Sequence, residues 1–196
     1  MKSIEKRNGI VLKNYCPNKQ KLIIFDEELG KIEAIFFARG HHMISAGSYL
    51  CYYAERTKNQ WYKLEGYELF HAPLQLARYE LYFYHHVLEL CYYFIPFELP
   101  LDGIFDLLKF LLYSYHEVAD SYKKKLFLLR FFVQLGIYPE EEFGLHTIGD
   151  YLLSQPIDVI LNTEIVSEKA LERWLFFCIK SHPQSDYFKT MLIGYK

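Results

Sequence analysis

The sequence predicts an α+β protein in which a small closed β-barrel is followed by an all-helical domain. Residues 1–70 contain short apolar runs with alternating spacing and turn signals, whereas residues 71–196 contain longer segments with helical spacing. Charge divides at the same place: residues 1–70 carry 11 basic and 8 acidic side chains, a net charge of +3, and residues 71–196 carry 11 and 16, a net charge of −5. We therefore expect a mildly basic domain over residues 1–70 and an acidic helical domain over residues 71–196.

Five short segments of the first domain are predicted as strands. Their ranges are 9–15, 20–26, 31–39, 48–56 and 60–64. Pro17 and Asn18 mark the first turn, and Gly30 follows a second, acidic turn. Five strands within about 60 residues favour a closed barrel, because closure removes the exposed edges of a sheet.

The second domain begins at Pro73 and opens with apolar or small residues in steps of three and four. This stripe consists of Leu74, Ala77, Leu81, Tyr84, Leu88, Cys91 and Ile95. A second stripe runs over residues 104–115, after a capping residue at Asp102. Residues 126–135 are apolar almost all round, which is typical of a central helix. Shorter helices are expected over residues 147–154, 169–181 and 187–193.

Composition excludes several classes of protein. Lys and Arg total 22 against 24 Asp and Glu, a net charge of −2, so the chain is not a globally basic nucleic-acid coat protein. The first residues lack a signal-peptide core, and no run approaches the roughly 20 apolar residues that cross a bilayer. The four cysteines are far apart, so we expect free buried thiols in a reducing cytoplasm. They are Cys16, Cys51, Cys91 and Cys178.

The order of several short pieces resembles the RecO family of recombination mediators. In the first domain these pieces are residues 9–12 (GIVL), 22–25 (LIIF), 30–32 and 38–40. In the second they are residues 79–90, 104–112, 126–136 and 172–192. The chain lacks the four cysteines in CxxC pairs that many members of that family carry, so no zinc or other cofactor is expected.

The resemblance implies that the first domain is an OB-fold and that the protein is not an enzyme. RecO-like proteins bind single- and double-stranded DNA, anneal complementary strands, and act with RecR to help RecA replace the single-strand-binding protein SSB. Their helical domain contacts the acidic, hydrophobic-ended tail of SSB. We therefore expect a cytoplasmic, nucleoid-associated DNA repair protein with no membrane partner.

Cations and aromatic residues of the predicted barrel are candidate DNA contacts, because a single strand needs a positive groove and flat faces for its bases. Alternation on the third strand places Lys31, Phe37 and Arg39 on one face, opposite a core face at residues 32, 34, 36 and 38. Tyr52 and Arg56 share a face of the fourth strand. The predicted DNA-binding residues are Lys13, Lys19, Lys21, Lys31, Phe37, Arg39 and Arg56. The alternative is that these are solvated charges and packed aromatics.

Three consecutive lysines at the start of a helix, residues 123–125, give a second candidate site. They oppose the helix macrodipole, and a bound anion would relieve that repulsion. Arg130 lies among Leu and Phe residues, where it could clamp a terminal carboxylate beside an apolar surface. The predicted SSB-tail contacts are Lys123, Lys124, Lys125 and Arg130. The alternative is a solvated lysine run with Arg130 paired to a local acid, Asp120 or Glu117.

Enzyme signatures are missing: the sequence has no GxxxxGK[ST], no GxGxxG after a strand and no GxSxG. The pairs His41-His42 and His85-His86, with Glu89 one helical turn after His85, raise a metal-dependent hydrolase as a minor alternative. Packing of these histidines among tyrosines is the simpler interpretation. The main rival to a DNA-binding mediator is a degenerate interaction scaffold, which the net charge of −2 and the aromatic content of 18% favour.

Overall fold

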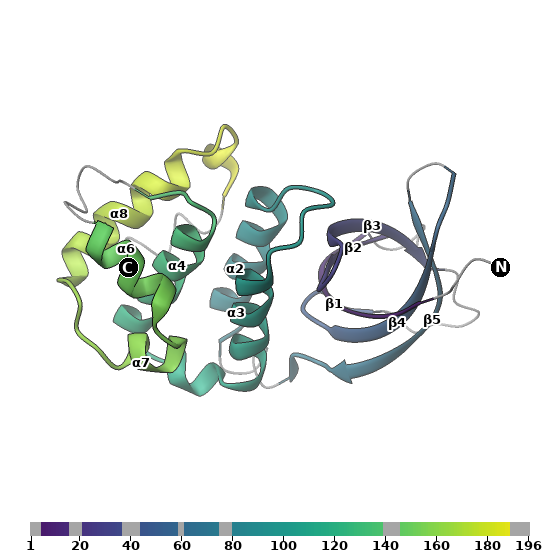
Figure 1. Ribbon diagram of the computed structural model, residues 1–196, viewed down its shortest axis with the longest axis horizontal. Helices are drawn as coiled ribbons and strands as arrows, with labels where there is room; N and C mark the ends of the chain where they lie inside the picture. Colours follow the sequence, from purple (N-terminus) through teal and green to yellow (C-terminus); the bar gives the residue numbers. More distant parts are fainter. Residues whose placement is uncertain are drawn as a thin grey trace. The chain divides into compact units, whose positions relative to one another are not determined.

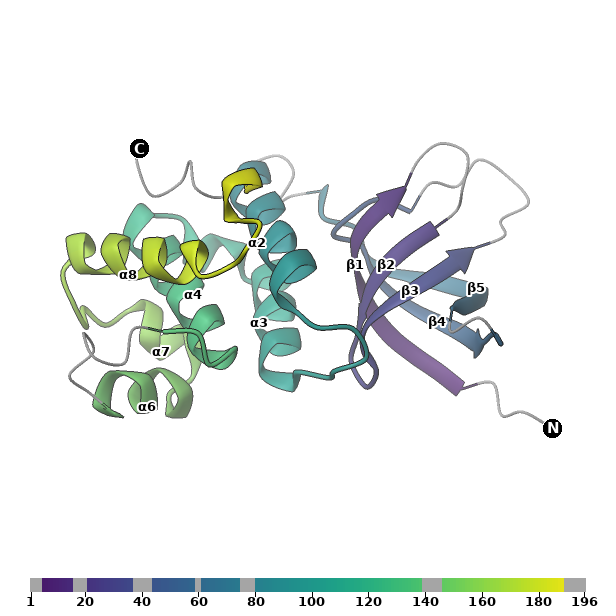
Figure 2. The ribbon, with the colours of Figure 1, turned by 90° about the horizontal axis from the view of Figure 1, so that it is seen from above.

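The computed structural model describes residues 5–15, 21–36, 44–58, 61–74, 80–138 and 146–188. The chain forms two compact units, Met1–Leu108 and Lys109–Lys196, each with its own set of elements (Figures 1 and 2). Three of the predicted DNA contacts lie outside the described residues, as do two of the histidines and one cysteine. These are Lys19, Phe37, Arg39, His41, His42 and Cys16.

Five strands close into a barrel in the first unit. They are β1 (Glu5–Tyr15), β2 (Lys21–Asp26), β3 (Gly30–Phe36), β4 (Tyr49–Arg56) and β5 (Tyr62–His71). Their order around the barrel is β1-β2-β3-β5-β4, with β3 and β5 parallel and the other pairs antiparallel. The predicted α+β class, an OB-fold barrel followed by helices, is confirmed (Figure 1).

β5 is longer than the predicted strand over residues 60–64. Its second half, EGYELFH, contains Gly66 and lacks clean alternation, yet it continues to pair with β4 up to the register Tyr49↔His71. Backbone pairing with a long neighbour therefore extends the strand where the side-chain pattern gives no signal.

Alternating side chains of all five strands fill the barrel. On β3 the inward residues are Ile32 and Ala34, with Phe36 packed against them, as the sequence predicts. The remaining core is formed by Val11, Leu22, Ile24, Ile44, Leu50, Tyr52, Tyr62 and Leu64. The hydroxyl of Tyr52 donates to the buried carboxylate of Asp26, so Tyr52 belongs to the core rather than to a binding face shared with Arg56.

The first compact unit extends beyond the predicted boundary at residue 70. Strands do give way to helices after His71, but α2 (Leu81–Phe94) and the start of α3 (Asp102–Tyr113) belong with the barrel. Phe105 packs edge-on against Phe25, with ring centroids 5.7 Å apart. The segment between the two helices pairs with β3, where Glu98 donates its N–H to the carbonyl of Lys31 at 2.9 Å. Gly30 leaves room for this segment, because a Cβ there would collide with the backbone of Leu99.

The second unit is helical and is built around α4 (Ser121–Gln134). The other described elements are η1 (Tyr115–Val118), α6 (His146–Ser154), α7 (Ile157–Leu161), α8 (Glu168–Lys180) and η2 (Ser185–Tyr187). Every residue of α4 from Lys125 to Val133 is buried, and the helix contacts α6, α7 and α8. The predicted central helix is thus confirmed. The short α7 was not predicted, because its five residues after Pro156 are too few to show a helical period.

Among the described residues, no helix combines the length and the apolar character that a membrane span requires.

Candidate nucleic-acid-binding site

Three lysines and two tyrosines lie together on the first unit. We call this group the lysine–tyrosine cluster: Lys13, Tyr15, Lys21, Lys31 and Tyr92. The Lys13 ammonium lies 4.4 Å from the ring centroid of Tyr92 and 5.0 Å from that of Tyr15. Lys21, which pairs with Tyr15 in the β1–β2 register, places its ammonium 5.3 Å from the Tyr15 centroid. The two tyrosine hydroxyls are hydrogen-bonded at 3.0 Å, so the cluster joins the β1–β2 hairpin to α2.

The charges of the cluster are unequally compensated. Lys21 forms a 2.7 Å ion pair with Glu33, and both side chains are partly exposed. Lys13 forms no ion pair with any described residue, and its ammonium lies over the two rings. An ammonium over an aromatic face is held by about 0.5–1 kcal/mol at an exposed position, less than an anionic ligand can offer. Lys13 is therefore the cation of this cluster that is most available to an anion.

Lys31 is not a surface cation, which corrects the sequence prediction. Alternation does place it on the outer face of β3, but the segment after α2 covers that face, and Lys31 is only 4% exposed. Its ammonium donates to the carbonyl of Tyr92 at 2.6 Å and lies 4.5 Å from the ring centroid of Phe97. Burial lowers the pKa of Lys31 to about 8. Lys31 therefore anchors α2 to the barrel and cannot reach a phosphate in this structure.

Arg56 is exposed but already paired. Its guanidinium donates to Glu98 at 2.6 Å and lies 5.8 Å from the ring centroid of Tyr62. Glu98 belongs to the segment that pairs with β3, so this ion pair joins the end of β4 to the same connection. The structure thus places Lys13 and Lys21 together and leaves Arg56 in a separate ion pair.

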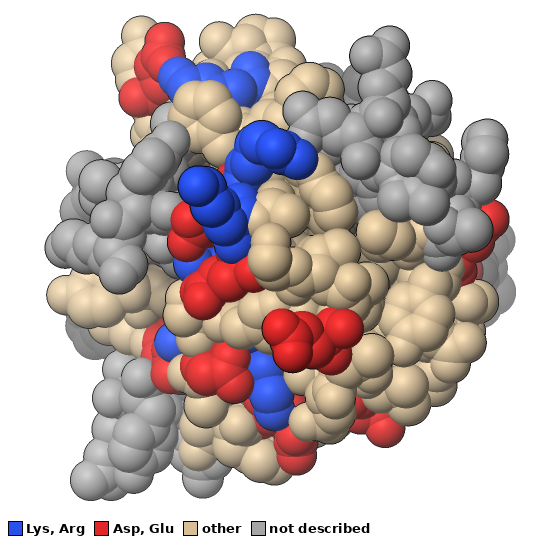
Figure 3. All heavy atoms as spheres, turned by 90° about the vertical axis from the view of Figure 1, so that its left-hand side faces the viewer, with Lys and Arg blue, Asp and Glu red and all other residues tan. Residues whose placement is uncertain are grey.

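The lysine run of α4 is largely occupied by partners from its own unit. Lys125 is 4% exposed and donates to Glu168 at 2.7 Å and Glu172 at 2.5 Å, both from α8. Burial alone would lower the pKa of Lys125, but these two hydrogen bonds and charges raise it. Asp120 accepts from the Lys123 backbone N–H at 2.8 Å and so caps the helix. On the described part of the face in Figure 3, basic and acidic side chains are interspersed.

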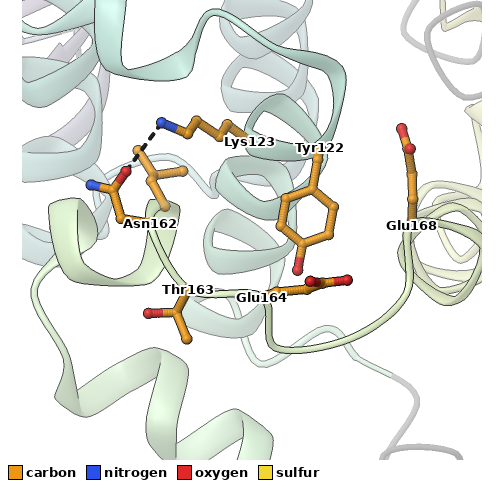
Figure 4. A pocket seen from close by; sticks show the side chains of 7 residues that line it. Tyr122, Lys123, Asn162, Thr163, Glu164 and Glu168 are labelled. Carbon is orange, nitrogen blue, oxygen red and sulfur yellow. Dashed lines mark hydrogen bonds between the residues drawn. The ribbon is translucent and has the colours of Figure 1, made fainter.

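A pocket of about 430 Å³ opens at the start of α4. Its lining consists of Tyr122, Lys123, Leu161, Asn162, Thr163, Glu164 and Glu168. Lys123 points to Asn162, with a 3.2 Å hydrogen bond, while the carboxylates of Glu164 and Glu168 lie beyond the ring of Tyr122 (Figure 4). The lining therefore carries both signs of charge and does not form the purely cationic site that the lysine run predicts.

Arg130 lies inside the helical unit and is 9% exposed. It donates to the carbonyl of Leu153 at 3.1 Å, in the last turn of α6, where a cation is favoured by the helix dipole. Neither of the acids considered from the sequence is its partner: Asp120 caps α4, and Glu117 lies 3.4 Å from His116. The Nε and Nη1 of Arg130 are buried and have no hydrogen-bond partner among the described residues, and burial lowers the pKa of the guanidinium.

The geometry of the described residues gives no support to the metal-dependent hydrolase alternative. Within the described ranges, no group of three or more His, Cys, Asp or Glu side chains is arranged to hold a metal ion. The described cysteines, Cys51, Cys91 and Cys178, are free and buried, and burial raises the pKa of the Cys178 thiol to about 12.

Sequence reasoning did not identify Tyr92 or Tyr15. Tyr92 directly follows Cys91, a member of the apolar stripe of its helix. The helical pattern therefore indicates only that Tyr92 faces away from the helical core. Nothing in the chain links Tyr92 to Lys13, because the two positions are brought together by the packing of α2 on β1.

No protein-family model and no curated protein sequence matches this chain. The resemblance to RecO therefore rests on the short sequence pieces and their order.

Proposed function

We propose that the protein is a RecO-like, non-enzymatic recombination mediator that binds DNA through its OB barrel. In this proposal it acts in the cytoplasm on the nucleoid, anneals complementary strands, and helps RecA, together with RecR, to replace SSB on single strands. The mechanism is physical. Lysines displace condensed counterions from phosphates, aromatic rings receive unstacked bases, and holding two strands together reduces the entropic barrier to their pairing.

The observation that carries the proposal is the position of Lys13. It lies across the rings of Tyr15 and Tyr92 without an ion pair among the described residues, on the outside of a closed OB barrel. A cation that is free to move to a phosphate, next to flat rings that can receive a base, is the arrangement that single-strand binding requires. Lys21 adds a second cation above Tyr15.

Fluorescence anisotropy with a labelled single-stranded oligonucleotide tests this function. We expect the affinity of the wild type to fall as salt is raised. We expect Lys13→Ala to lower the affinity by about 3- to 10-fold more, because one phosphate contact is lost. Lys63→Ala is the matched control, because Lys63 is a barrel lysine on β5 that is paired with Glu65 at 2.8 Å. Absence of binding by the wild-type protein at low salt would contradict the DNA-mediator function.

The proposed contact with SSB has its support in Arg130. Its buried Nε and Nη1 lack hydrogen-bond partners among the described residues, and they point to opposite edges of the guanidinium, so a carboxylate that enters after the surrounding side chains move could accept from one of them. A peptide with an acidic stretch and a C-terminal Phe is the probe. We expect it to bind the wild-type protein and to bind Arg130→Lys several-fold more weakly, because a compact ammonium on a flexible stem does not reproduce the positions of the guanidinium nitrogens. Equal affinity for both proteins would remove Arg130 from the proposed contact.

A protein-interaction scaffold with little DNA affinity is the alternative. It is favoured by the ion pairs that already compensate Lys21, Arg56 and Lys125. A scaffold would bind protein partners and show no salt-dependent affinity for oligonucleotides, so the anisotropy titration separates the two functions.

A further inference from the structure

The lysine–tyrosine cluster is not confined to the barrel, because one of its two rings comes from helix α2. We propose that Tyr92 is a base-stacking residue of the nucleic-acid site, so that α2 supplies part of the binding surface rather than only a connection to the helices that follow. This inference rests on the proposed DNA-binding function and names a residue and an element that the sequence did not assign to it.

Tyr92 is held in place from its backbone side. The carbonyl of Tyr92 lies in the last turn of α2, where helix carbonyls lack intrahelical partners, and it accepts the 2.6 Å hydrogen bond from buried Lys31. Lys31 is fixed in turn by the backbone pairing of β3 with the segment at Phe97 and Glu98. The end of α2 is therefore anchored on β3, and the ring of Tyr92 has a defined position beside β1.

The ring of Tyr92 is partly exposed and is oriented by its neighbours. Its hydroxyl is 3.0 Å from that of Tyr15, and the ring of Tyr93 packs edge-on at 5.0 Å between centroids. These contacts restrain the ring before any ligand arrives, which limits the ordering cost of binding. Two tyrosines linked through their hydroxyls form a pair of platforms that can receive neighbouring bases.

Lys13 occupies the face of Tyr92 that a base would take. Its ammonium is 4.4 Å from the ring centroid, and the same cation is 5.0 Å from Tyr15. Because no ion pair with a described residue holds Lys13, its transfer from the ring to a phosphate breaks no salt bridge. A single strand therefore makes two gains at once: a base replaces the ammonium on the ring, and the ammonium moves to the backbone of the strand.

Oligonucleotides with and without bases test this inference on the full-length protein. We expect Tyr92→Ala to weaken binding of a normal oligonucleotide of about 15 nucleotides by roughly 5- to 140-fold, the range for loss of one base stack. The same variant should bind an abasic strand of equal length as the wild type does. Tyr92→Phe keeps the ring and should retain wild-type affinity. Tyr53→Ala is the matched control, because Tyr53 is a 41% exposed barrel tyrosine outside the cluster.

Photocrosslinking tests the inference on the wild-type protein, so its result does not depend on whether the variants fold. An oligonucleotide carrying iodouracil is irradiated with the wild-type protein, and the modified residue is identified by mass spectrometry. We expect adducts at Tyr92 or Tyr15. If the wild type binds DNA and Lys13→Ala weakens binding, but Tyr92→Ala does not and adducts form only at other residues, the inference fails while the proposed function stands. If the wild type does not bind DNA, both fail.

Discussion

Lys31 illustrates how a correct local pattern can lead to a wrong assignment at the scale of one residue. The strand period correctly separates Lys31 from the core face, but it does not reveal that the outer face is covered by the chain that follows α2. The buried ammonium is satisfied by the Tyr92 carbonyl and by the ring of Phe97. This buried lysine connects β3 to α2, and its pKa therefore depends on the fold.

Lys31 should make stability depend on pH in the alkaline range. Its pKa is lowered to about 8 in the folded protein from 10.5, so between these pH values the unfolded chain binds one more proton than the folded one. The free energy of unfolding of the wild type, relative to that of Lys31→Met, should therefore rise from pH 8 towards pH 10.5, by up to about 3 kcal/mol in total. Urea unfolding of both proteins across this range measures the difference.

The comparison with Lys31→Met is needed because other groups titrate nearby. Burial also raises the pKa of Cys91, which makes the folded state lose stability as pH rises above the ordinary value for a thiol. The part of that effect that is due to burial is present in both proteins and cancels, whereas the charge of Lys31, which lowers the pKa of Cys91, is present only in the wild type. A difference between wild type and Lys31→Met that stays constant with pH would show that folding leaves the pKa of Lys31 unchanged.

At the scale of elements, the lysine run of α4 shows how a helix start can tolerate cations without a bound anion. The carboxylate of Asp120 caps the first turn, and Lys125 reaches across to Glu168 in the first turn of α8. Glu168 is favoured by the helix dipole at the start of α8, and it is also the partner of a lysine near the start of α4. The ion pairs join the two helices where both begin.

Replacing Lys125 should weaken the connection between α4 and α8. We expect Lys125→Met to lower the free energy of unfolding by about 1–2 kcal/mol at neutral pH, between the values typical of exposed and buried ion pairs. Hydrogen bonds from Lys125 and Ser121 lower the pKa of Glu168, so its contribution is present above pH 4.5 and is lost as pH falls below that value. The variant should therefore lose less stability than the wild type on acidification.

Lys169→Met is the control for this prediction, because Lys169 is an exposed lysine of α8 in the same turn as Glu168. Its stability should follow that of the wild type from pH 7 to about pH 3 in chemical unfolding. Equal acid sensitivity of all three proteins would mean that the Lys125 ion pairs contribute nothing to the folded state.

At the scale of the whole molecule, charge does not divide as the two compact units do. Residues 1–108 carry 12 basic and 13 acidic side chains, and residues 109–196 carry 10 and 11, so each unit has a net charge of −1. The basic excess belongs to residues 1–70, strands and connections together. Neither unit carries a net positive charge, so the proposed DNA binding would depend on a few local cations such as Lys13 and Lys21.

This charge distribution sets the expected slope of the salt titration described above. Single strands give a slope of about −0.7 in log affinity against log salt for each phosphate neutralised. With two lysines of the cluster partly exposed to solvent, we expect a slope of roughly −1 to −3. A much steeper slope would mean that the binding surface includes many cations beyond the cluster.

The sequence by itself determined the class of fold, the inward face of β3 and the central position of α4. These features follow from short-range periods: alternate residues of a strand share a face, and an apolar helix is buried on all sides. Only the tertiary structure decided which cations reach solvent. Lys31 and Lys125 look like surface charges in the sequence, and each is buried because an element distant in the chain packs over it. The cluster of Lys13 with Tyr15 and Tyr92 arises in the same way, since burial and proximity across the chain depend on packing and leave no mark in local sequence periodicity.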